Sequence, residues 1–173
     1  MAEKYQNKYR IQTTRAPWWD YGSNAAYFVT ICTKDRVHYF GRVVNGMMQS
    51  SDIGKIADAC WLAIPDHFPF VKLGNHIIMP NHTHGIIIID KPPGPRGNEQ
   101  PKNRFGPQSQ NLASIVRGFK IGVTKNARRI NPNFTWQSRY HDHIIRDARA
   151  YNAISRYIAN NPQKWQEDRF YAS

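Results

Sequence analysis

The order in which strand-like and helix-like segments follow one another most constrains the fold of this chain. Four runs rich in β-branched and aromatic residues have the composition of β-strands. They are residues 26–33, 70–79, 84–90 and 134–145. Three segments show helical spacing of apolar residues. They are residues 51–64, 111–129 and 147–160. Two strands flank each of the first two helices, so we predict an α+β fold: a ferredoxin-like antiparallel sheet of about four main strands, with helices packed mainly on one face.

Short-range signals mark where these elements begin and turn. Asn45-Gly46, between two apolar pairs, is typical of a type I′ hairpin turn. Ser51 and Asp147 each precede a helical pattern and are suited to cap it. We expect an apolar stripe of the first helix to face the core. Its members are Ile53, Ile56, Cys60 and Ile64.

The chain is expected to form one domain with an arm at its start. Residues 1–25 are predicted to be an irregular arm in which basic and aromatic side chains alternate. Residues 26–173 are predicted to form a single domain, which a length of 173 residues allows. Within it, residues 91–110 are rich in proline and glycine and are predicted to be a loop.

The chain is strongly basic, with 24 Lys and Arg against 12 Asp and Glu and a net charge of +12. The excess is concentrated in residues 91–129, where Glu99 is the one acid, and in the arm. Cations interleaved with aromatic rings suit single-stranded nucleic acid, although a basic surface that only aids solubility is the alternative. The candidate DNA-binding residues are Lys4, Lys8, Arg10, Arg15, Arg104, Arg117, Lys120, Lys125 and Arg128.

The sequence predicts a cytoplasmic protein with no membrane segment. The longest aliphatic run, Ile86 to Ile89, is far too short to cross a bilayer, and the first ten residues lack the apolar core of a signal peptide. Two cysteines, Cys32 and Cys60, do not make a disulfide scaffold, which favours a reducing compartment.

His82 and His84 form the most specific candidate for a chemical site in the sequence. Side chains alternate along a strand, so both imidazoles are expected on one face, where they could chelate a divalent metal with a third ligand from elsewhere. The alternative is a pair of structural histidines with satisfied hydrogen bonds. A second pair, His141 and His143, has the same spacing.

Tyr157 and Asn161 lie one turn apart on the last predicted helix and share one of its faces. A lone helical tyrosine usually packs its ring and exposes its hydroxyl group. Together with the histidine pair and the basic surface, however, it allows one reaction. A metal would polarise a phosphodiester, and the tyrosine oxygen would attack phosphorus to form a covalent intermediate.

Four segments carry a resemblance to a known family. They are IMPNHTHGIII (78–88), NLASIVRGFK (111–120), WQSRYHDHIIR (136–146) and RYIANNPQKW (156–165). In sequence, order and spacing they resemble the REP-associated tyrosine transposases, a branch of the single-tyrosine HUH transposases. The resemblance covers about residues 26–171.

The resemblance implies a transposase: a metal-dependent single-stranded DNA endonuclease and strand transferase that acts at hairpin-forming palindromes. His82 and His84 match the histidines that hold Mg²⁺ or Mn²⁺, and Asn161 matches a third, polar ligand. Tyr157 matches the nucleophile, which would form a 5′-phosphotyrosine. Thr83 departs from the family pattern, which has a hydrophobic residue between the histidines. The protein is expected to act as a monomer or a homodimer.

Two other functions stay open at this point. A hairpin-binding protein derived from a transposase would bind DNA without cleaving it. A zinc enzyme would use both histidine pairs, His82 with His84 and His141 with His143.

Overall fold

The computed structural model describes residues 4–5, 8–9, 19–93 and 110–171. Its main strands are β3 (Ala25–Thr33), β6 (Val71–Met79), β7 (His82–Ile89) and β8 (Trp136–Ile145), and its helices are α1 (Asp52–Leu62), α2 (Ile64–His67), α3 (Leu112–Ala127) and α4 (Ala148–Asn160). Two short hairpins accompany them, β1 (Lys4–Tyr5) with β2 (Lys8–Tyr9) and β4 (Gly41–Val44) with β5 (Met47–Ser50). The first hairpin lies within the arm that was expected to be irregular.

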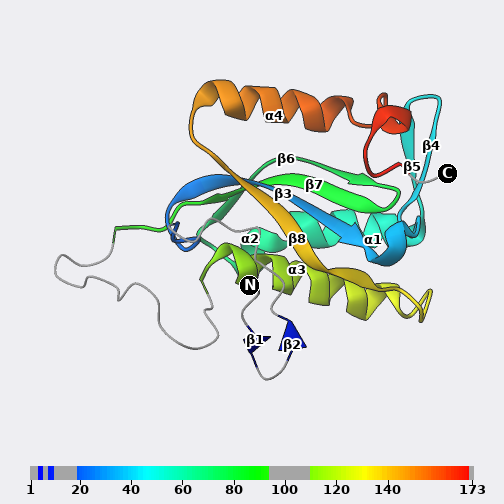
Figure 1. Ribbon diagram of the computed structural model, residues 1–173, viewed down its shortest axis with the longest axis horizontal. Helices are drawn as coiled ribbons and strands as arrows, with labels where there is room; N and C mark the ends of the chain where they lie inside the picture. Colours follow the sequence, from blue (N-terminus) through cyan, green and yellow to red (C-terminus); the bar gives the residue numbers. More distant parts are fainter. Residues whose placement is uncertain (1–3, 6–7, 10–18, 94–109, 172–173) are drawn as a thin grey trace.

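The four main strands form one antiparallel sheet in the order β6-β7-β3-β8 (Figure 1). The first and third strands along the chain, β3 and β7, are therefore the two central strands. This order confirms the predicted α+β, ferredoxin-like fold.

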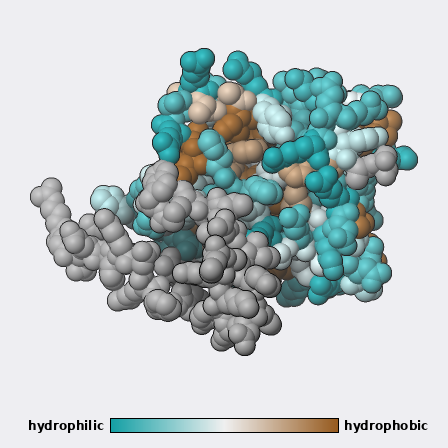
Figure 2. Space-filling view, in the orientation of Figure 1, coloured by the Kyte–Doolittle hydropathy of each residue, from teal (hydrophilic) through white to brown (hydrophobic). Residues whose placement is uncertain are grey.

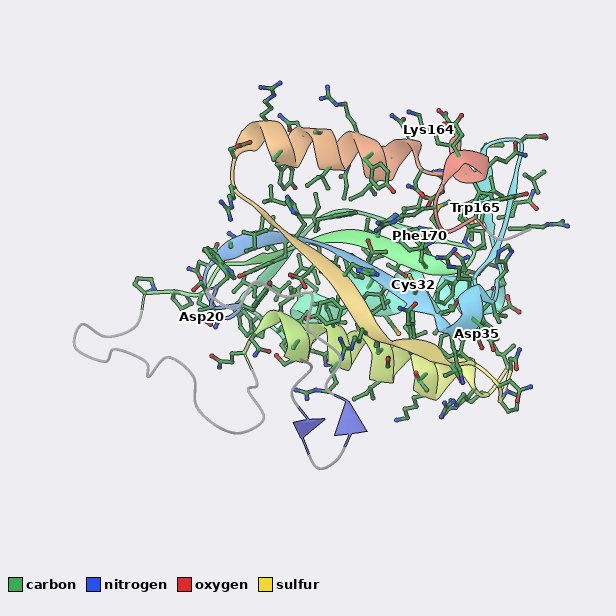
Figure 3. All side chains as sticks on the ribbon, viewed as in Figure 1. Asp20, Cys32, Asp35, Lys164, Trp165 and Phe170 are labelled. Carbon is green, nitrogen blue, oxygen red and sulfur yellow. The ribbon has the colours of Figure 1, made fainter. Side chains whose placement is uncertain are left out.

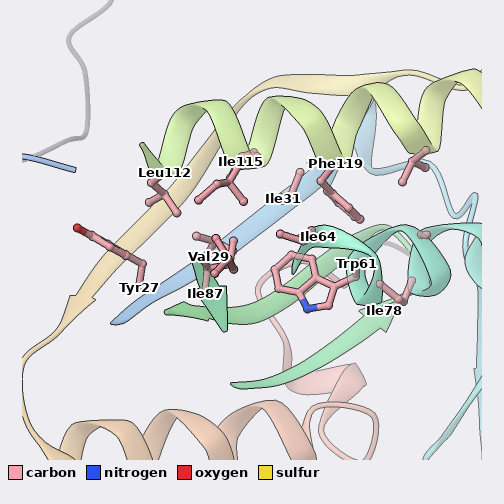
Figure 4. Packing of buried hydrophobic residues seen from close by; sticks show 14 of the residues in the cluster. Tyr27, Val29, Ile31, Trp61, Ile64, Ile78, Ile87, Leu112, Ile115 and Phe119 are labelled. Carbon is pink, nitrogen blue, oxygen red and sulfur yellow. The ribbon is translucent and has the colours of Figure 1, made fainter. Parts of the chain in front are cut away.

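The helices divide between the two faces of the sheet (Figure 1). α1, α2 and α3 cover one face, and α4 lies on the other, against β6 and β7. The larger core lies between the sheet and α1 and α3, as Figure 4 shows for side chains that include Val29, Trp61, Ile87, Ile115 and Phe119. A smaller cluster, which includes Ile86, Ile154 and Ile158, joins α4 to the sheet. Figure 2 shows hydrophilic residues over the outer side of α4.

The predicted helix caps and the predicted hairpin turn are both found in the structure. The side chains of Ser51 and Asp147 accept hydrogen bonds from backbone N–H groups in the first turns of α1 and α4. Asn45 and Gly46 both have positive φ, at 51° and 71°, as a type I′ turn requires.

The buried stripe of α1 differs from the predicted one. Ile53, Ala57 and Trp61 are its buried apolar residues, whereas Ile56 and Cys60 are only half-buried at its edge. The large indole of Trp61 sets which side of the helix faces the sheet, because it fills the space left by the absent side chain of Gly85.

The segment after α4 folds back on the domain through its aromatic residues. Trp165 and Phe170 are buried with Cys32 and Met79 at one end of the sheet (Figure 3). In the described part of the chain, none of the helices has the length and apolar character needed to cross a membrane.

Candidate active site

His82 and His84 lie side by side on β7, on the face of the sheet that α4 partly covers. Their side chains are 0% and 1% exposed, and their ring centroids are 4.4 Å apart. Thr83, between them, is also buried but belongs to the opposite face, so it does not separate the two rings. The alternation of β7 thus places both imidazoles on one face, as predicted.

Hydrogen bonds behind the two rings fix their positions. Nδ1 of His82 lies 2.8 Å from Oδ1 of Asn81, and Nδ1 of His84 lies 2.8 Å from Oγ1 of Thr30. Nε2 of His82 is buried and has no hydrogen-bond partner among the described residues. Burial lowers the pKa of both imidazoles, that of His84 to about 3. Both rings are therefore neutral near pH 7, the form in which histidine binds metals.

Tyr157 reaches this pair from α4. Its Oη lies 3.5 Å from Nε2 of His84, and Phe28 contacts both rings, edge-on to the phenol and stacked on the imidazole. Tyr157 is 45% exposed, so one side of the ring is open to solvent. Partial burial and the nearby Asp168 raise the pKa of the phenol, whereas a hydrogen bond from the Asn161 amide lowers it, and the net shift is upward. The phenol is thus protonated at neutral pH.

Asn161 and Asp168 bring oxygen atoms to the same place. Asn161 caps the end of α4, is 3% exposed, and has a buried Oδ1 without a hydrogen-bond partner among the described residues. One carboxylate oxygen of Asp168 and one nitrogen from each of His82 and His84 all lie within 4.8 Å of one another. Asp168 is not among the candidate site residues predicted from the sequence. The signal in the sequence that could have indicated it is an acid in a tail with several aromatic residues, which pack back on the domain.

An open groove of about 530 Å³ runs beside Tyr157 along the end of α4 and the tail. Three basic and two acidic side chains line it. They are Arg156, Lys164, Arg169, Glu167 and Asp168. Tyr157 is thus part of the groove lining, and the charged side chains of the groove sum to one net positive charge.

The predicted DNA-binding residues whose side chains the structure describes are not brought together with this site. Arg10, Arg15 and Arg104 lie outside the described residues, and only the backbone of Lys4 and Lys8 is described. The other four lie on α3 or at its end, beyond the sheet from α4 (Figure 1).

Two of these four basic residues also hold the start of the β8 segment. Lys120 Nζ donates to the carbonyl oxygen of Gln137, and Arg128 Nε donates to that of Phe134. Arg117 and Lys125 are exposed on the same helix. The charge of α3 therefore lies on a separate surface from the groove.

His141 and His143 do not join the buried pair. They are exposed on β8, and His141 pairs with Thr30 on β3, which in turn pairs with His84. Two strand spacings, about 10 Å, thus separate the two histidine pairs. Within the described part of the chain, the potential metal-binding cluster consists of His82, His84 and Asp168, so the four-histidine zinc site considered from the sequence is wrong.

The side chains at the site fit a divalent cation. Nε2 of His82 and Oδ1 of Asn161 are buried acceptors without a donor among the described residues, an arrangement that costs free energy unless something satisfies them. Two imidazole nitrogens with a carboxylate and an amide oxygen form a mixed donor set typical of such ions.

The fold is similar to that of a solved transposase. The structure is similar to that of a REP-associated tyrosine transposase bound to a REP hairpin, with a TM-score of 0.60 and 18% identity, over 89% of this chain and 74% of that one. In sequence, the chain is 41% identical over 181 residues to an uncharacterized protein of Haemophilus influenzae, with 99% of each covered. The chain belongs to the family of that protein. No protein-family model matches the sequence.

Proposed function

We propose that this protein is a single-stranded DNA endonuclease and strand transferase in which Tyr157 attacks a phosphodiester beside a divalent metal bound by His82 and His84. The observation that carries the proposal is the 3.5 Å distance between the Tyr157 oxygen and Nε2 of His84. This distance supports the roles proposed here for the phenol as nucleophile and for the two neutral, buried imidazoles as metal ligands. The similarity of fold to a REP-associated tyrosine transposase supports the same reaction class.

The chemistry follows from the side chains of the site. A Mg²⁺ or Mn²⁺ ion would supply charge to polarise the phosphodiester and lower the pKa of the phenol. Tyr157 would form a bond to phosphorus while the bond between phosphorus and the 3′ oxygen breaks. The phenol proton leaves to water on the exposed side of the ring, and the 3′ oxygen takes a proton from water. The products are a 5′-phosphotyrosine and a free 3′-hydroxyl group.

Strand transfer is the reverse of this step with a different 3′-hydroxyl group. The phosphotyrosine bond conserves the free energy of the original diester, so no nucleoside triphosphate is needed. Asn161, one helical turn after Tyr157, would hold the phenol oxygen through the hydrogen bond from its amide.

We propose hairpin-forming palindromes as the substrate and the cytoplasm as the compartment. The structural relative is described as bound to a REP hairpin. One chain supplies both the histidine pair and the tyrosine, so the reaction as proposed requires only a monomer. The basic residues predicted to contact DNA would then hold the hairpin outside the groove.

The test is formation of a covalent protein–DNA adduct on a single-stranded hairpin substrate in Mn²⁺. Tyr157→Phe should abolish the adduct, because the attacking oxygen is removed while the ring remains. Tyr151→Phe is the matched control, since Tyr151 lies on the same helix but packs against the sheet; it should form the adduct as the parent does.

An adduct formed by Tyr157→Phe would exclude Tyr157 as the nucleophile. A parent protein that binds hairpins but forms no adduct in any divalent metal would instead identify the non-cleaving DNA-binding protein.

A further inference from the structure

We propose that the C-terminal segment is part of the metal centre: Asp168 supplies a charged ligand, and Asn81 couples the docking of this segment to the orientation of His82. The proposal rests on the proposed function only in taking the histidine pair to bind a divalent metal. It adds a ligand and a positioning residue that the motifs did not indicate.

Asp168 is held in place by its own neighbours. Its Oδ1 accepts a hydrogen bond from the backbone N–H of Phe170 at 2.8 Å, and its carbonyl oxygen accepts one from Tyr171 at 2.9 Å. These bonds fix the carboxylate within 4.8 Å of the ligand nitrogens of His82 and His84. A tight turn of the segment thus presents one acid to the pair.

The charge balance around the histidine pair favours an acidic ligand. The two imidazoles and the Asn161 amide are neutral ligands, and Arg36 and Arg169 lie close by, each over a face of the Phe170 ring. A divalent cation held only by neutral groups beside two guanidinium groups would be poorly compensated. In the described part of the chain, Asp168 is the acid that the histidine cluster contains.

The rest of the segment is docked on the imidazoles themselves. The Phe170 ring lies 4.6 Å from the ring of His82 and 5.9 Å from that of His84, measured between centroids. Arg36 Nη1 donates to the carbonyl oxygen of Arg169 at 3.0 Å, which adds a further hydrogen bond between the segment and the domain. Undocking would therefore withdraw Asp168 and uncover the histidines together.

Asn81 connects this docking to the histidine. It is 1% exposed, and its Nδ2 donates to the carbonyl oxygens of Phe170 at 2.8 Å and Arg36 at 3.3 Å. Both partners are acceptors, so the orientation of the amide is determined and its Oδ1 must face Nδ1 of His82. An amide oxygen only accepts, so the proton of the neutral ring sits on Nδ1.

The consequence is that Nε2 of His82 carries the free lone pair that a metal needs. The same Asn81 amide thus holds the C-terminal segment with one atom and sets the histidine tautomer with the other. Metal binding and docking of the segment are then linked, and each must stabilise the other.

The test measures Mn²⁺ binding to the full chain by calorimetry, without DNA. Asp168→Asn keeps an oxygen for the Phe170 N–H but removes the charge, and it should weaken Mn²⁺ binding by about 10-fold or more. Glu167→Gln is the matched control, a neighbouring acid in the same groove but outside the histidine cluster; it should bind as the parent does.

A second measurement reports on the docking of the C-terminal segment. Mn²⁺ should slow hydrogen exchange at the Tyr171 amide in the parent chain and not in Asp168→Asn. Asn81→Asp retains the acceptor for His82 but faces the carbonyl oxygens of Phe170 and Arg36 with a second acceptor. It should speed this exchange and lower Mn²⁺ affinity.

Two outcomes overturn the proposal: Mn²⁺ affinity of Asp168→Asn within twofold of the parent, or exchange at Tyr171 that saturating Mn²⁺ leaves unchanged. Neither depends on Tyr157 or DNA. A protein that fails to form the covalent adduct but passes these tests would therefore refute the proposed function alone.

Discussion

Single hydrogen bonds decide which nitrogen atoms of the histidine pair are free to act. Asn81 hydrogen-bonds Nδ1 of His82, and Thr30 hydrogen-bonds Nδ1 of His84. Both rings therefore present Nε2 to the side where Tyr157 and Asp168 lie. Because both rings are buried, neither is protonated readily, and the folded chain resists protons that the unfolded chain accepts.

With metal removed by a chelator, we therefore expect the free energy of unfolding to fall as the pH drops below 6.5. Burial lowers the pKa of His84 to about 3. Its contribution is complete above pH 6.5, the unfolded value, and is lost as the pH falls, by about 2 kcal/mol at pH 5. Urea unfolding at pH 7 and pH 5 measures the difference.

His84→Gln should lose that part of the pH dependence, whereas His141→Gln, at an exposed position, should keep it. A pH dependence in His84→Gln equal to that of the parent would contradict the prediction.

At the level of elements, β7 serves both faces of the sheet. On one face it carries the histidine pair, and on the other Gly85 lets the Trp61 indole of α1 pack directly against the strand. A Cβ atom at Gly85 would overlap three carbon atoms of that indole. The close approach of α1 to β7 thus depends on the absence of one side chain.

Gly85→Ala should lower the stability of the protein by about 1–3 kcal/mol, because the indole must move within a packed core. Gly122→Ala is the matched control. Its Cβ would make only an ordinary contact, 3.6 Å from Cys60 Sγ, inside α3, where alanine should add about 0.5–1 kcal/mol. Thermal and urea unfolding of both variants measure the effects, and equal changes in the two would rule out the proposed packing.

Across the whole molecule, the sheet separates two sets of candidate functional residues, the basic residues of α3 and the side chains around Tyr157. α3, which carries the basic residues, lies on one side of the sheet, and α4 lies on the other (Figure 1). The groove runs along the end of α4, and His84 contacts Tyr157 of that helix. A nucleic acid that uses both surfaces must pass around an edge of the sheet, as a folded hairpin with a single-stranded flank could.

Replacing both Arg117 and Lys125 by alanine should therefore weaken hairpin binding and leave cleavage of a short single strand unchanged. The loss of two phosphate contacts should reduce the slope of log K against log salt by about 2. Binding titrations at several salt concentrations, with a parallel cleavage assay, measure both effects. Unchanged hairpin binding would remove α3 from the DNA-contacting surface.

The sequence alone determined the local geometry of the site. The two-residue repeat of a strand puts His82 and His84 on one face of β7. The helical repeat puts Tyr157 and Asn161 on one face of α4. These are properties of neighbouring residues. The order of the segments also determined the fold class, because few topologies join such strands with short connections.

Only the tertiary structure decided how these pieces meet. The packing of apolar helix faces against the sheet puts α4 on the opposite side from α1 and α3. This arrangement brings Tyr157 beside His84, which lies 73 residues earlier in the chain. The same long-range packing brings Asp168 to the histidines and moves the charge of α3 to the opposite side. Neither result follows from local periodicity, because each depends on contacts between segments far apart in the sequence.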